Sequence, residues 1–347
     1  MAATHFLTGS YSSADEPGIK LWEFDEDTGH IVELMGVKGI ERPSYIAIHP
    51  NGTSFVAASE VGDGGELVAY WIHAQSRKIS EINRQKANGD HPAHVCIDEE
   101  GDWLLTCNYS GGNVNVYPLH MDGSIGDLAD SVSHSGSGAN SERQEAAHPH
   151  SIFQIPGTNL FLVSDLGTDH IYTYKLNSAN GQLKIKDITE SVSGTGPRHL
   201  AFHPSKPFVY SLGELNSTLT VYFVGQEEKL ETYQIVNLLP EQFEGLNTAA
   251  EVAVSEDGAF LYASNRGHDS LAVFAIRENG LLQLVGHVPS GGKGPRHFAL
   301  VSAQHWLIAA NEQSNTLNLF RIGEDGLPHP ENQPVHTKAP VCVKILR

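Results

Sequence analysis

One short pattern recurs along the chain at an almost constant interval. Each copy begins with a proline or a small residue, continues with one or two small or polar residues, and runs into an alternating apolar segment. The seven copies begin at Pro43, Pro92, Pro149, Pro197, Ala249, Pro295 and Pro340. They lie about 50 residues apart, and a period of that length indicates stacked supersecondary units that bury a common core.

Each repeat predicts four short strands. In the copy that starts at Ala249, an alternating segment over 249–254 is followed by a turn at 256–258 and a more apolar strand at 260–264. A third strand at 271–274 ends in an aromatic residue, and a weaker fourth strand covers 281–284. Because no segment shows the 3.6-residue period of a helix, each repeat has the pattern of a propeller blade.

The two ends of the chain complete the count of blades. Residues 5–37 predict only three strands, and residues 341–346 predict one more. Pairing these segments gives a seventh blade without an exposed sheet edge. We therefore expect an all-β, seven-bladed β-propeller with four antiparallel strands per blade, in which the C-terminal strand joins the N-terminal blade. We expect residues 1–347 to form one domain, because the even spacing disfavours two separate all-β domains.

Composition restricts the partners. The formal charge is −19, from 41 acidic and 22 basic residues, and such a field repels nucleic acid and anionic membranes. There is no long apolar stretch and no basic leader, and the three cysteines (Cys96, Cys107 and Cys342) are too few for a disulfide framework. We expect a cytoplasmic protein, a monomer or weak homodimer, with no nucleic-acid or membrane partner. Cofactor motifs are absent, so no cofactor is expected.

Two positions in every blade of a propeller meet at one mouth of the channel. These are the residues just inside the first strand and those that end the second strand. The first-strand positions hold Ser44, Ala93, His150, Arg198, Ala250, Arg296 and Val341, followed by Tyr45, His94, Ser151, His199, Glu251, His297 and Cys342. The second strands end at Tyr109, Leu166, Glu214, Arg266 and Glu312.

Three of the ten arginines, Arg198, Arg266 and Arg296, fall at these positions. On an acidic protein they predict a local cationic centre for a small anionic substrate. The alternative is a structural network, such as Arg266 paired with Glu214 or Glu312. The expected substrate-binding residues are Arg296, His297, Lys293, His94, Asn265, Asn108 and Glu312.

Close histidine pairs raise the possibility of a metal site. His148 and His150, and likewise His91 and His94, are near neighbours in the sequence. Neither pair has helical i, i+4 spacing or an evident carboxylate ligand. We therefore predict no metal site.

Several strings resemble a known family, the seven-bladed propeller lactonases. They are Thr8-Gly9-Ser10-Tyr11, Asn108-Tyr109-Ser110-Gly111-Gly112, Gly196-Pro197-Arg198-His199, Ser264-Asn265-Arg266-Gly267-His268-Asp269-Ser270 and Gly294-Pro295-Arg296-His297. The family includes bacterial 6-phosphogluconolactonases and a fungal enzyme that cyclises carboxymuconate. Carried over by motif, the resemblance implies catalytic roles for His150, Arg198, Glu214 and Arg266.

The resemblance implies hydrolysis of 6-phosphoglucono-δ-lactone, a small anionic sugar lactone of the pentose phosphate pathway. Either Glu214 or His150 is the expected base, and the sequence leaves this choice open. Two alternatives also remain at this point: a carboxymuconate cyclase-like or other sugar-lactone enzyme, and a non-catalytic propeller scaffold. A propeller by itself does not decide between them, because the fold carries no fixed function.

Overall fold

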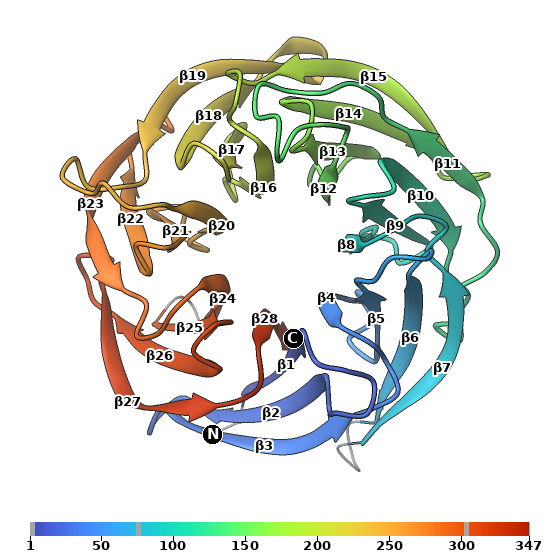
Figure 1. The fold of residues 1–347 in the computed structure, drawn as a ribbon, viewed down its shortest axis with the longest axis horizontal. Helices are drawn as coiled ribbons and strands as arrows, with labels where there is room; N and C mark the ends of the chain where they lie inside the picture. The colour runs from blue at the N-terminus through green and yellow to red at the C-terminus, as the bar shows by residue number, and fades with distance from the viewer. Residues whose placement is uncertain (1–3, 74–77, 302–304, 347) are drawn as a thin grey trace. The chain divides into compact units, whose positions relative to one another are not determined.

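The computed structural model describes residues 4–73, 78–301 and 305–346. These residues form seven four-stranded antiparallel sheets, and their one helical turn is a 3₁₀ segment at Gln226–Glu228 (Figure 1). The all-β content and the four strands of every predicted blade are therefore confirmed. Short turns join the strands within a sheet, as the Gly- and Asn-rich punctuation of the repeats predicts.

The chain divides into two compact units. The first unit consists mainly of Pro197–Ile345 with Phe24–Ile31, and the second consists mainly of His5–Glu23 and Val32–Gly196. Each unit contains three consecutive blades. The expectation of a single domain over residues 1–347 stays a prediction.

The three blades of the first unit follow one another in sequence order. Their strands are β16 (Pro197–Phe202), β17 (Phe208–Gly213), β18 (Thr218–Val224), β19 (Leu230–Asn237), β20 (Thr248–Val254), β21 (Phe260–Arg266), β22 (Ser270–Ile276), β23 (Leu282–Pro289), β24 (Pro295–Val301), β25 (Trp306–Asn311), β26 (Thr316–Ile322) and β27 (Pro328–His336). The first strands β16, β20 and β24 contact one another in turn.

The three blades of the second unit have the same order. Their strands are β4 (Pro43–Ile48), β5 (Ser54–Ser59), β6 (Glu66–His73), β7 (Lys78–Lys86), β8 (Pro92–Ile97), β9 (Trp103–Asn108), β10 (Asn113–Pro118), β11 (Asp130–Ser133), β12 (Pro149–Gln154), β13 (Leu160–Asp165), β14 (His170–Asn177) and β15 (Gln182–Glu190). Here β4, β8 and β12 are the first strands and contact one another in turn.

The seventh sheet combines the two ends of the chain. Its strand order is β28-β1-β2-β3, with β28 at Pro340–Leu346, β1 at Thr4–Ser10, β2 at Ile19–Asp25 and β3 at His30–Val37. The C-terminal strand is thus a member of the N-terminal sheet, as the repeat count predicts.

A β-bulge recurs between the first and second strands of the blades. In the β16–β17 pair, Pro197 lies opposite Gly213 and His199 opposite Leu212, so Arg198 is the extra residue. The same shift leaves Arg296 unpaired in β24 and His150 unpaired in β12. A bulge turns its extra side chain out of the regular alternation of the strand. The bulges therefore occupy the first-strand positions at which the sequence predicts functional residues.

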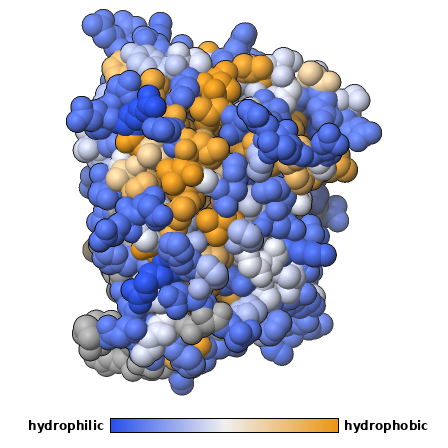
Figure 2. Space-filling view, turned by 90° about the vertical axis from the view of Figure 1, so that its left-hand side faces the viewer, coloured by the Kyte–Doolittle hydropathy of each residue, from blue (hydrophilic) through white to orange (hydrophobic). Residues whose placement is uncertain are grey.

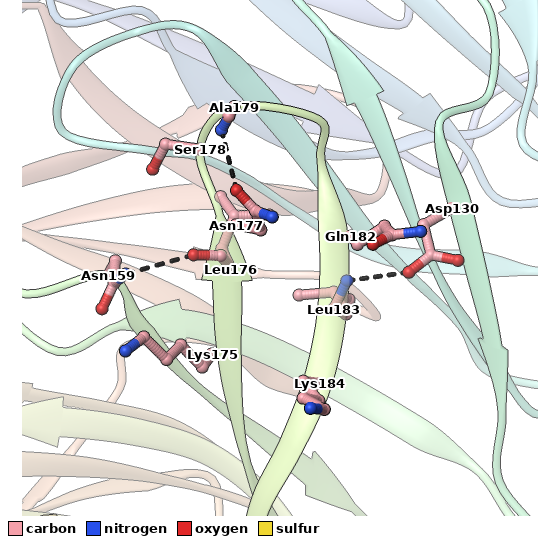
Figure 3. A pocket seen from close by; sticks show the side chains of 10 residues that line it. All are labelled: Asp130, Asn159, Lys175, Leu176, Asn177, Ser178, Ala179, Gln182, Leu183 and Lys184. Carbon is pink, nitrogen blue, oxygen red and sulfur yellow. Dashed lines mark hydrogen bonds between the residues drawn. The ribbon is translucent and has the colours of Figure 1, made fainter.

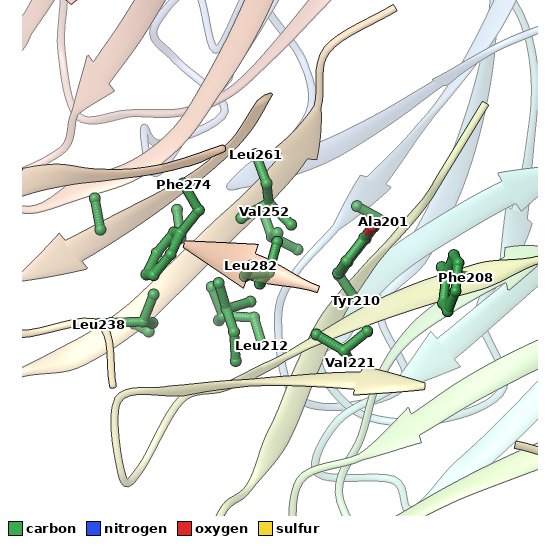
Figure 4. Close-up of a cluster of buried hydrophobic side chains, with 14 residues drawn as sticks. Ala201, Phe208, Tyr210, Leu212, Val221, Leu238, Val252, Leu261, Phe274 and Leu282 are labelled. Atoms are coloured by element: carbon green, nitrogen blue, oxygen red, sulfur yellow. The ribbon is translucent and has the colours of Figure 1, made fainter. Parts of the chain in front are cut away.

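The hydrophobic core of the first unit lies between neighbouring blades. Figure 4 shows the cluster that joins the β16–β19 and β20–β23 sheets, in which Tyr210, Leu212, Leu261 and Phe274 are almost fully buried. Burial of apolar surface stabilises such a cluster by about 25 cal/mol per Å². At the turn after β20, Gly258 has a φ of 71°, which favours glycine.

The outermost strands keep some hydrophobic side chains at the surface. Figure 2 shows a band of hydrophobic residues between hydrophilic ones on one face of the molecule. In the first unit, Tyr233 and Ile235 of β19 and Leu284 of β23 are exposed. The inner strands are far more buried, so the most constrained side chains lie on the first two strands of each blade.

Candidate active site

A carboxylate joins two arginines in the first unit. Oε2 of Glu214 lies 2.9 Å from Nε of Arg198 and 3.1 Å from Nη2 of Arg266. Arg198 is the bulged residue of β16, Glu214 follows the last residue of β17, and Arg266 ends β21. The sequence allowed an ion pair between Arg266 and Glu214, and that pair is present.

Backbone carbonyls of β20 hold the two guanidinium groups. Arg198 donates from Nη1 to the carbonyl of Ala250. Arg266 donates to the carbonyls of Thr248 and Ala249, at 3.4 and 3.0 Å. Nη1 of Arg266 makes no hydrogen bond within the described part of the chain, so this nitrogen keeps its donors for a ligand.

Arg266 keeps its positive charge in this buried setting. Burial lowers the pKa of its guanidinium to about 10, and Glu214 opposes that shift. Arg198 and Arg296 lower this pKa further by repulsion. A pKa near 10 still leaves the group protonated at neutral pH. The site thus holds cations close together, at the cost of mutual repulsion that an anion relieves.

Arg296 is the most exposed arginine of the group. It is the bulged residue of β24, and its Nη1 lies 4.0 Å from Oε2 of Glu312, which follows β25. Their side chains are 18% and 27% exposed, against 3% for Arg198. The predicted substrate-binding residue Lys293 is exposed, and its backbone N–H donates to Ser314. The arginines and carboxylates thus form one cluster whose side chains become more exposed from Arg198 through Arg266 to Arg296, with Glu214 and Glu312 as the carboxylates.

A second carboxylate bridges two histidines in the same unit. Oε2 of Glu251 lies 3.0 Å from Nδ1 of His199 and 3.3 Å from Nε2 of His297. All three side chains are buried. Burial lowers the pKa of His199 well below its ordinary value and lowers the pKa of His297 to about 3. Both imidazoles are thus neutral at neutral pH.

Sequence reasoning singled out His297 but passed over His199 and Glu251. All three occupy the second first-strand position of successive blades. The sequence does contain a sign of this bridge. Glu251 is an acidic residue among apolar neighbours, and the blades before and after it have a histidine at the same position.

The predicted binding residues Asn265 and Asn108 are fully buried and bonded to the backbone. Asn265 donates to the carbonyl of Leu238 at 3.2 Å, and Asn108 donates to the carbonyl of Ala87 at 3.1 Å. Each side chain holds the connection that enters its own blade. Their substrate-binding role stays a prediction beside this structural one.

Two further predicted residues belong to the second unit. The ring of His94 lies between Tyr45 and Phe153, with ring centroids 4.1 and 4.6 Å away. His150 is the bulged residue of β12, is buried, and meets Tyr109 edge-on at 5.7 Å. The catalytic role of His150 stays a prediction.

Residues 5–345 match the family described as lactonase, 7-bladed beta-propeller. The chain belongs to this lactonase family. The seven-bladed β-propeller predicted from the repeats is therefore confirmed, and so is the resemblance on which the site residues were chosen.

Relatives of this lactonase-family chain are similar over nearly their whole length. A 6-phosphogluconolactonase of Bacillus subtilis is 33% identical over 341 residues, which cover 97% of each chain. The solved periplasmic gluconolactonase of Pseudomonas aeruginosa has a TM-score of 0.94 at 27% identity, covering 100% of this chain and 99% of that one. A putative 6-phosphogluconolactonase from Bacteroides fragilis has a TM-score of 0.92 at 27% identity, covering 99% and 98%.

Other features of this lactonase-family chain add no second site. Within residues 4–73, 78–301 and 305–346, no three His, Cys, Asp or Glu side chains are grouped to hold a metal ion. Nor is any helix there long and apolar enough to cross a membrane.

The second unit has a hollow of about 800 Å³ beside the β14–β15 turn (Figure 3). Two of its polar side chains bond to the backbone, since Asp130 accepts from the N–H of Leu183 and Asn159 donates to the carbonyl of Leu176. None of the predicted site residues lines it.

Proposed function

We propose that this protein hydrolyses a sugar lactone, and that 6-phosphoglucono-δ-lactone is its substrate. The observation that carries the proposal is the pair of arginines held by Glu214, with Nη1 of Arg266 available, on a chain of net charge −19. Relatives named 6-phosphogluconolactonase and gluconolactonase support the same chemistry. An anionic sugar lactone matches a cationic cluster that is rimmed by hydrogen-bonding groups.

Hydrolysis makes three demands on the site. Water must lose a proton as it attacks the lactone carbonyl, the resulting oxyanion must be stabilised, and the ring oxygen must take up a proton as its bond to the carbonyl carbon breaks. Arg266 supplies a charged donor for the oxyanion through Nη1. Glu214 and the β20 carbonyls keep that guanidinium fixed, so little reorganisation is needed as charge develops.

Arg296 serves the substrate's phosphate in this proposal. It is more exposed than Arg198 or Arg266, and its ion pair with Glu312 is long. A guanidinium can bind phosphate in bidentate fashion. Arg198 contributes its charge and holds Glu214 in place.

The base is the remaining assignment. The sequence predicts Glu214 or His150, and a neutral imidazole suits proton transfer near pH 7. The variant His150→Asn distinguishes the two, because Glu214 also holds Arg198 and Arg266 and its replacement would lower kcat in either case. If His150 is the base, His150→Asn lowers kcat while KM changes little. If Glu214 is the base, His150→Asn leaves kcat close to that of the wild type.

The experiment that tests the function is hydrolysis of freshly generated 6-phosphogluconolactone, coupled to 6-phosphogluconate dehydrogenase. A blank without protein is essential, because this lactone opens spontaneously. Unphosphorylated glucono-δ-lactone is the matched comparison substrate. We expect a rate well above the blank with a preference for the phosphorylated lactone. A rate equal to the blank for both lactones would overturn the proposal.

The cellular setting belongs to the same proposal. A 6-phosphogluconolactonase would act in the pentose phosphate pathway in the cytoplasm, on a small molecule, as a monomer or weak homodimer without nucleic-acid or membrane partners. Fractionation of cells and sedimentation of the purified protein test these points separately from the assay.

A further inference from the structure

The Glu251 bridge runs beside the arginine cluster on three strands. On β16, His199 directly follows Arg198, and on β24, His297 directly follows Arg296. On β20, Glu251 directly follows Ala250, whose carbonyl accepts a hydrogen bond from Arg198. On each of the three strands, the bridge residue is thus the sequence neighbour of an arginine or of a residue that an arginine contacts.

The bridge also lies where the backbone departs from a regular ladder. The bulges of β16 and β24 fall between Pro197 and His199 and between Pro295 and His297, and β20 has an irregularity between Ala249 and Val252. Inside the β20 irregularity, the backbone N–H of Glu251 donates to Ser264 at 3.0 Å. A bulged segment has fewer ladder hydrogen bonds to fix it, so side-chain bonds decide its position.

The two histidines meet Glu251 through different ring nitrogens. Nδ1 of His199 is hydrogen-bonded to Oε2 of Glu251 at 3.0 Å, and because an ionised carboxylate only accepts, Nδ1 is the protonated nitrogen of that ring. Nε2 of His297 lies 3.3 Å from the same oxygen. The bridge thus fixes the tautomer of His199 and brings both rings to one carboxylate oxygen.

A buried polar bridge is a costly way to hold strands together. Replacing buried ionic groups by packed apolar residues is often neutral or stabilising. The second unit has a ring contact instead of a carboxylate bridge at the same strand position, where Tyr45 lies against His94 with ring centroids 4.1 Å apart. Hydrogen bonds differ from such packing because they specify direction and distance.

We propose that Glu251 is a positioning residue, which fixes the spacing of β16, β20 and β24 through His199 and His297 and thereby aims Arg198 and Arg296 at the anionic substrate. The activity part of this inference rests on the proposed function. The bridge itself and anion binding do not depend on it.

The first experiment reads the bridge without any substrate. Nitrogen-15 NMR of histidine-labelled protein reports the tautomer of each imidazole, and His199→Gln and His297→Gln assign the two signals. We expect Nδ1–H in His199, held by its hydrogen bond to Oε2 of Glu251. Glu251→Ala removes that acceptor, so the His199 signal should move toward that of a tautomer mixture, and the His297 signal should change because its ring faces the same oxygen. Unchanged signals of both histidines in Glu251→Ala would overturn the bridge.

The second experiment measures kcat and KM on 6-phosphogluconolactone for Glu251→Gln and Glu251→Ala. Tyr262→Phe is the matched control, because Tyr262 lies in the same blade as Glu251 and its replacement removes one buried hydrogen bond, to Gly326 of the next blade at 2.9 Å. Glu251→Ala should lower kcat/KM about 100-fold, the effect of displacing catalytic groups by about 1 Å. Glu251→Gln, which keeps the bridge, should stay within about threefold of the wild type if spacing rather than charge matters. A loss in Glu251→Ala no larger than in Tyr262→Phe, or an equal loss in Gln and Ala, would overturn the proposal.

A third measurement separates this inference from the proposed function. Calorimetric binding of 6-phosphogluconate and of inorganic phosphate needs no turnover. If the wild type does not hydrolyse the lactone but Glu251→Ala weakens phosphate binding at least tenfold, the proposed substrate fails and the positioning role holds. If Glu251→Ala binds both anions like the wild type, the positioning role fails whatever the enzyme hydrolyses.

Discussion

The two units use the same strand positions for opposite chemistry. In the first unit, the bulged first-strand positions include Arg198 and Arg296, and the positions after them carry His199, Glu251 and His297. In the second unit, the bulged positions are Ser44, Ala93 and His150, followed by Tyr45, His94 and Ser151. The contacts differ accordingly, with ion pairs and carboxylate bridges in one unit and ring packing in the other.

The comparison shows that the repeat specifies where the bulged residue lies and not what its side chain does. The bulge recurs in six of the sheets within the described residues, whether its side chain is charged, aromatic or small. Function in a propeller lies in the side chains placed on the repeated backbone. Here the paired arginines and the Glu251 bridge lie in the blades from β16 to β27.

The largest expected effect comes from removing the guanidinium that has an available nitrogen. Arg266→Ala should lower kcat/KM about 1,000-fold, because losing a preorganised oxyanion donor costs a factor of 10² to 10³ in rate. Ser44→Ala changes the bulged residue of β4 in the second unit and should stay close to the wild type. Lactone hydrolysis under the coupled assay measures both. Equal losses of kcat/KM in the two variants would contradict a functional difference between the two units.

Breaking the buried ion pair should cost stability in the first unit. Glu214→Ala leaves Arg198 and Arg266 buried without their shared carboxylate, and such a loss costs about 3–5 kcal/mol of unfolding free energy. Glu331→Ala is the comparison, since its ion pair with Arg321 is 3.9 Å long and exposed; such pairs contribute about 0–1 kcal/mol. Urea denaturation followed by fluorescence gives both values. A Glu214→Ala loss as small as the surface one would contradict a buried, coupled cluster.

A matched asparagine pair tests what the two units share. Asn265→Ala and Asn108→Ala each leave a buried backbone carbonyl without its donor, which costs about 1–3 kcal/mol. We expect equal losses of unfolding free energy in both units. A KM that rises for only one variant would support the predicted substrate-binding role of that asparagine, so the kinetic assay accompanies the denaturation.

Arg296→Ala should have a smaller kinetic effect than Arg266→Ala. We expect KM for the phosphorylated lactone to rise about tenfold with little change in kcat, because the arginine would bind substrate and transition state alike. KM for the unphosphorylated lactone is the internal control and should not change. A fall in kcat on both lactones would assign Arg296 to the reacting carbonyl.

The smallest expected effect is the change in unfolding free energy between pH 6.5 and pH 5. His199 and His297 have pKa values below their ordinary value of 6.5 when folded, so the unfolded chain binds more protons below that pH. The contribution of these two histidines to stability is therefore complete above pH 6.5, and the part from His297 falls as the pH drops toward about 3, where His297 titrates in the fold. The slope is about 1 kcal/mol per pH unit for each histidine. His297→Asn should flatten the slope of thermal stability between pH 6.5 and 5, and an unchanged slope would contradict its burial as a neutral group.

The fold could be predicted from the sequence almost completely. Pattern and period are local, so the four strands of each blade, from 249–254 to 281–284 for example, follow from alternation and turn residues. The strand order β28-β1-β2-β3 followed from counting strands. Arg198, Glu214 and Arg266 could be grouped because they share positions in the repeat.

The remaining contacts of the site could not be predicted, because they depend on the local path of the backbone. The β-bulge at Arg198 depends on register, which strand propensity does not specify. The second carboxylate bridge was missed because one Glu251 among alanines and valines does not show that it will meet histidines from two other strands. Asn265 and Asn108 illustrate a different difficulty. The sequence predicts a binding role for them, but it cannot show that their side chains donate to backbone carbonyls.

The bulged residue of each first strand also matters for protein engineering. That residue is left out of the hydrogen-bonded ladder, so its side chain does not have to match a partner directly across the strand pair. Six of the sheets in the described residues have this position, with side chains that range from alanine to arginine. Ser44 and Ala93 are buried at this position, so a larger side chain there would have to displace its neighbours, whereas the half-buried Arg296 is the natural starting point for a new ligand specificity.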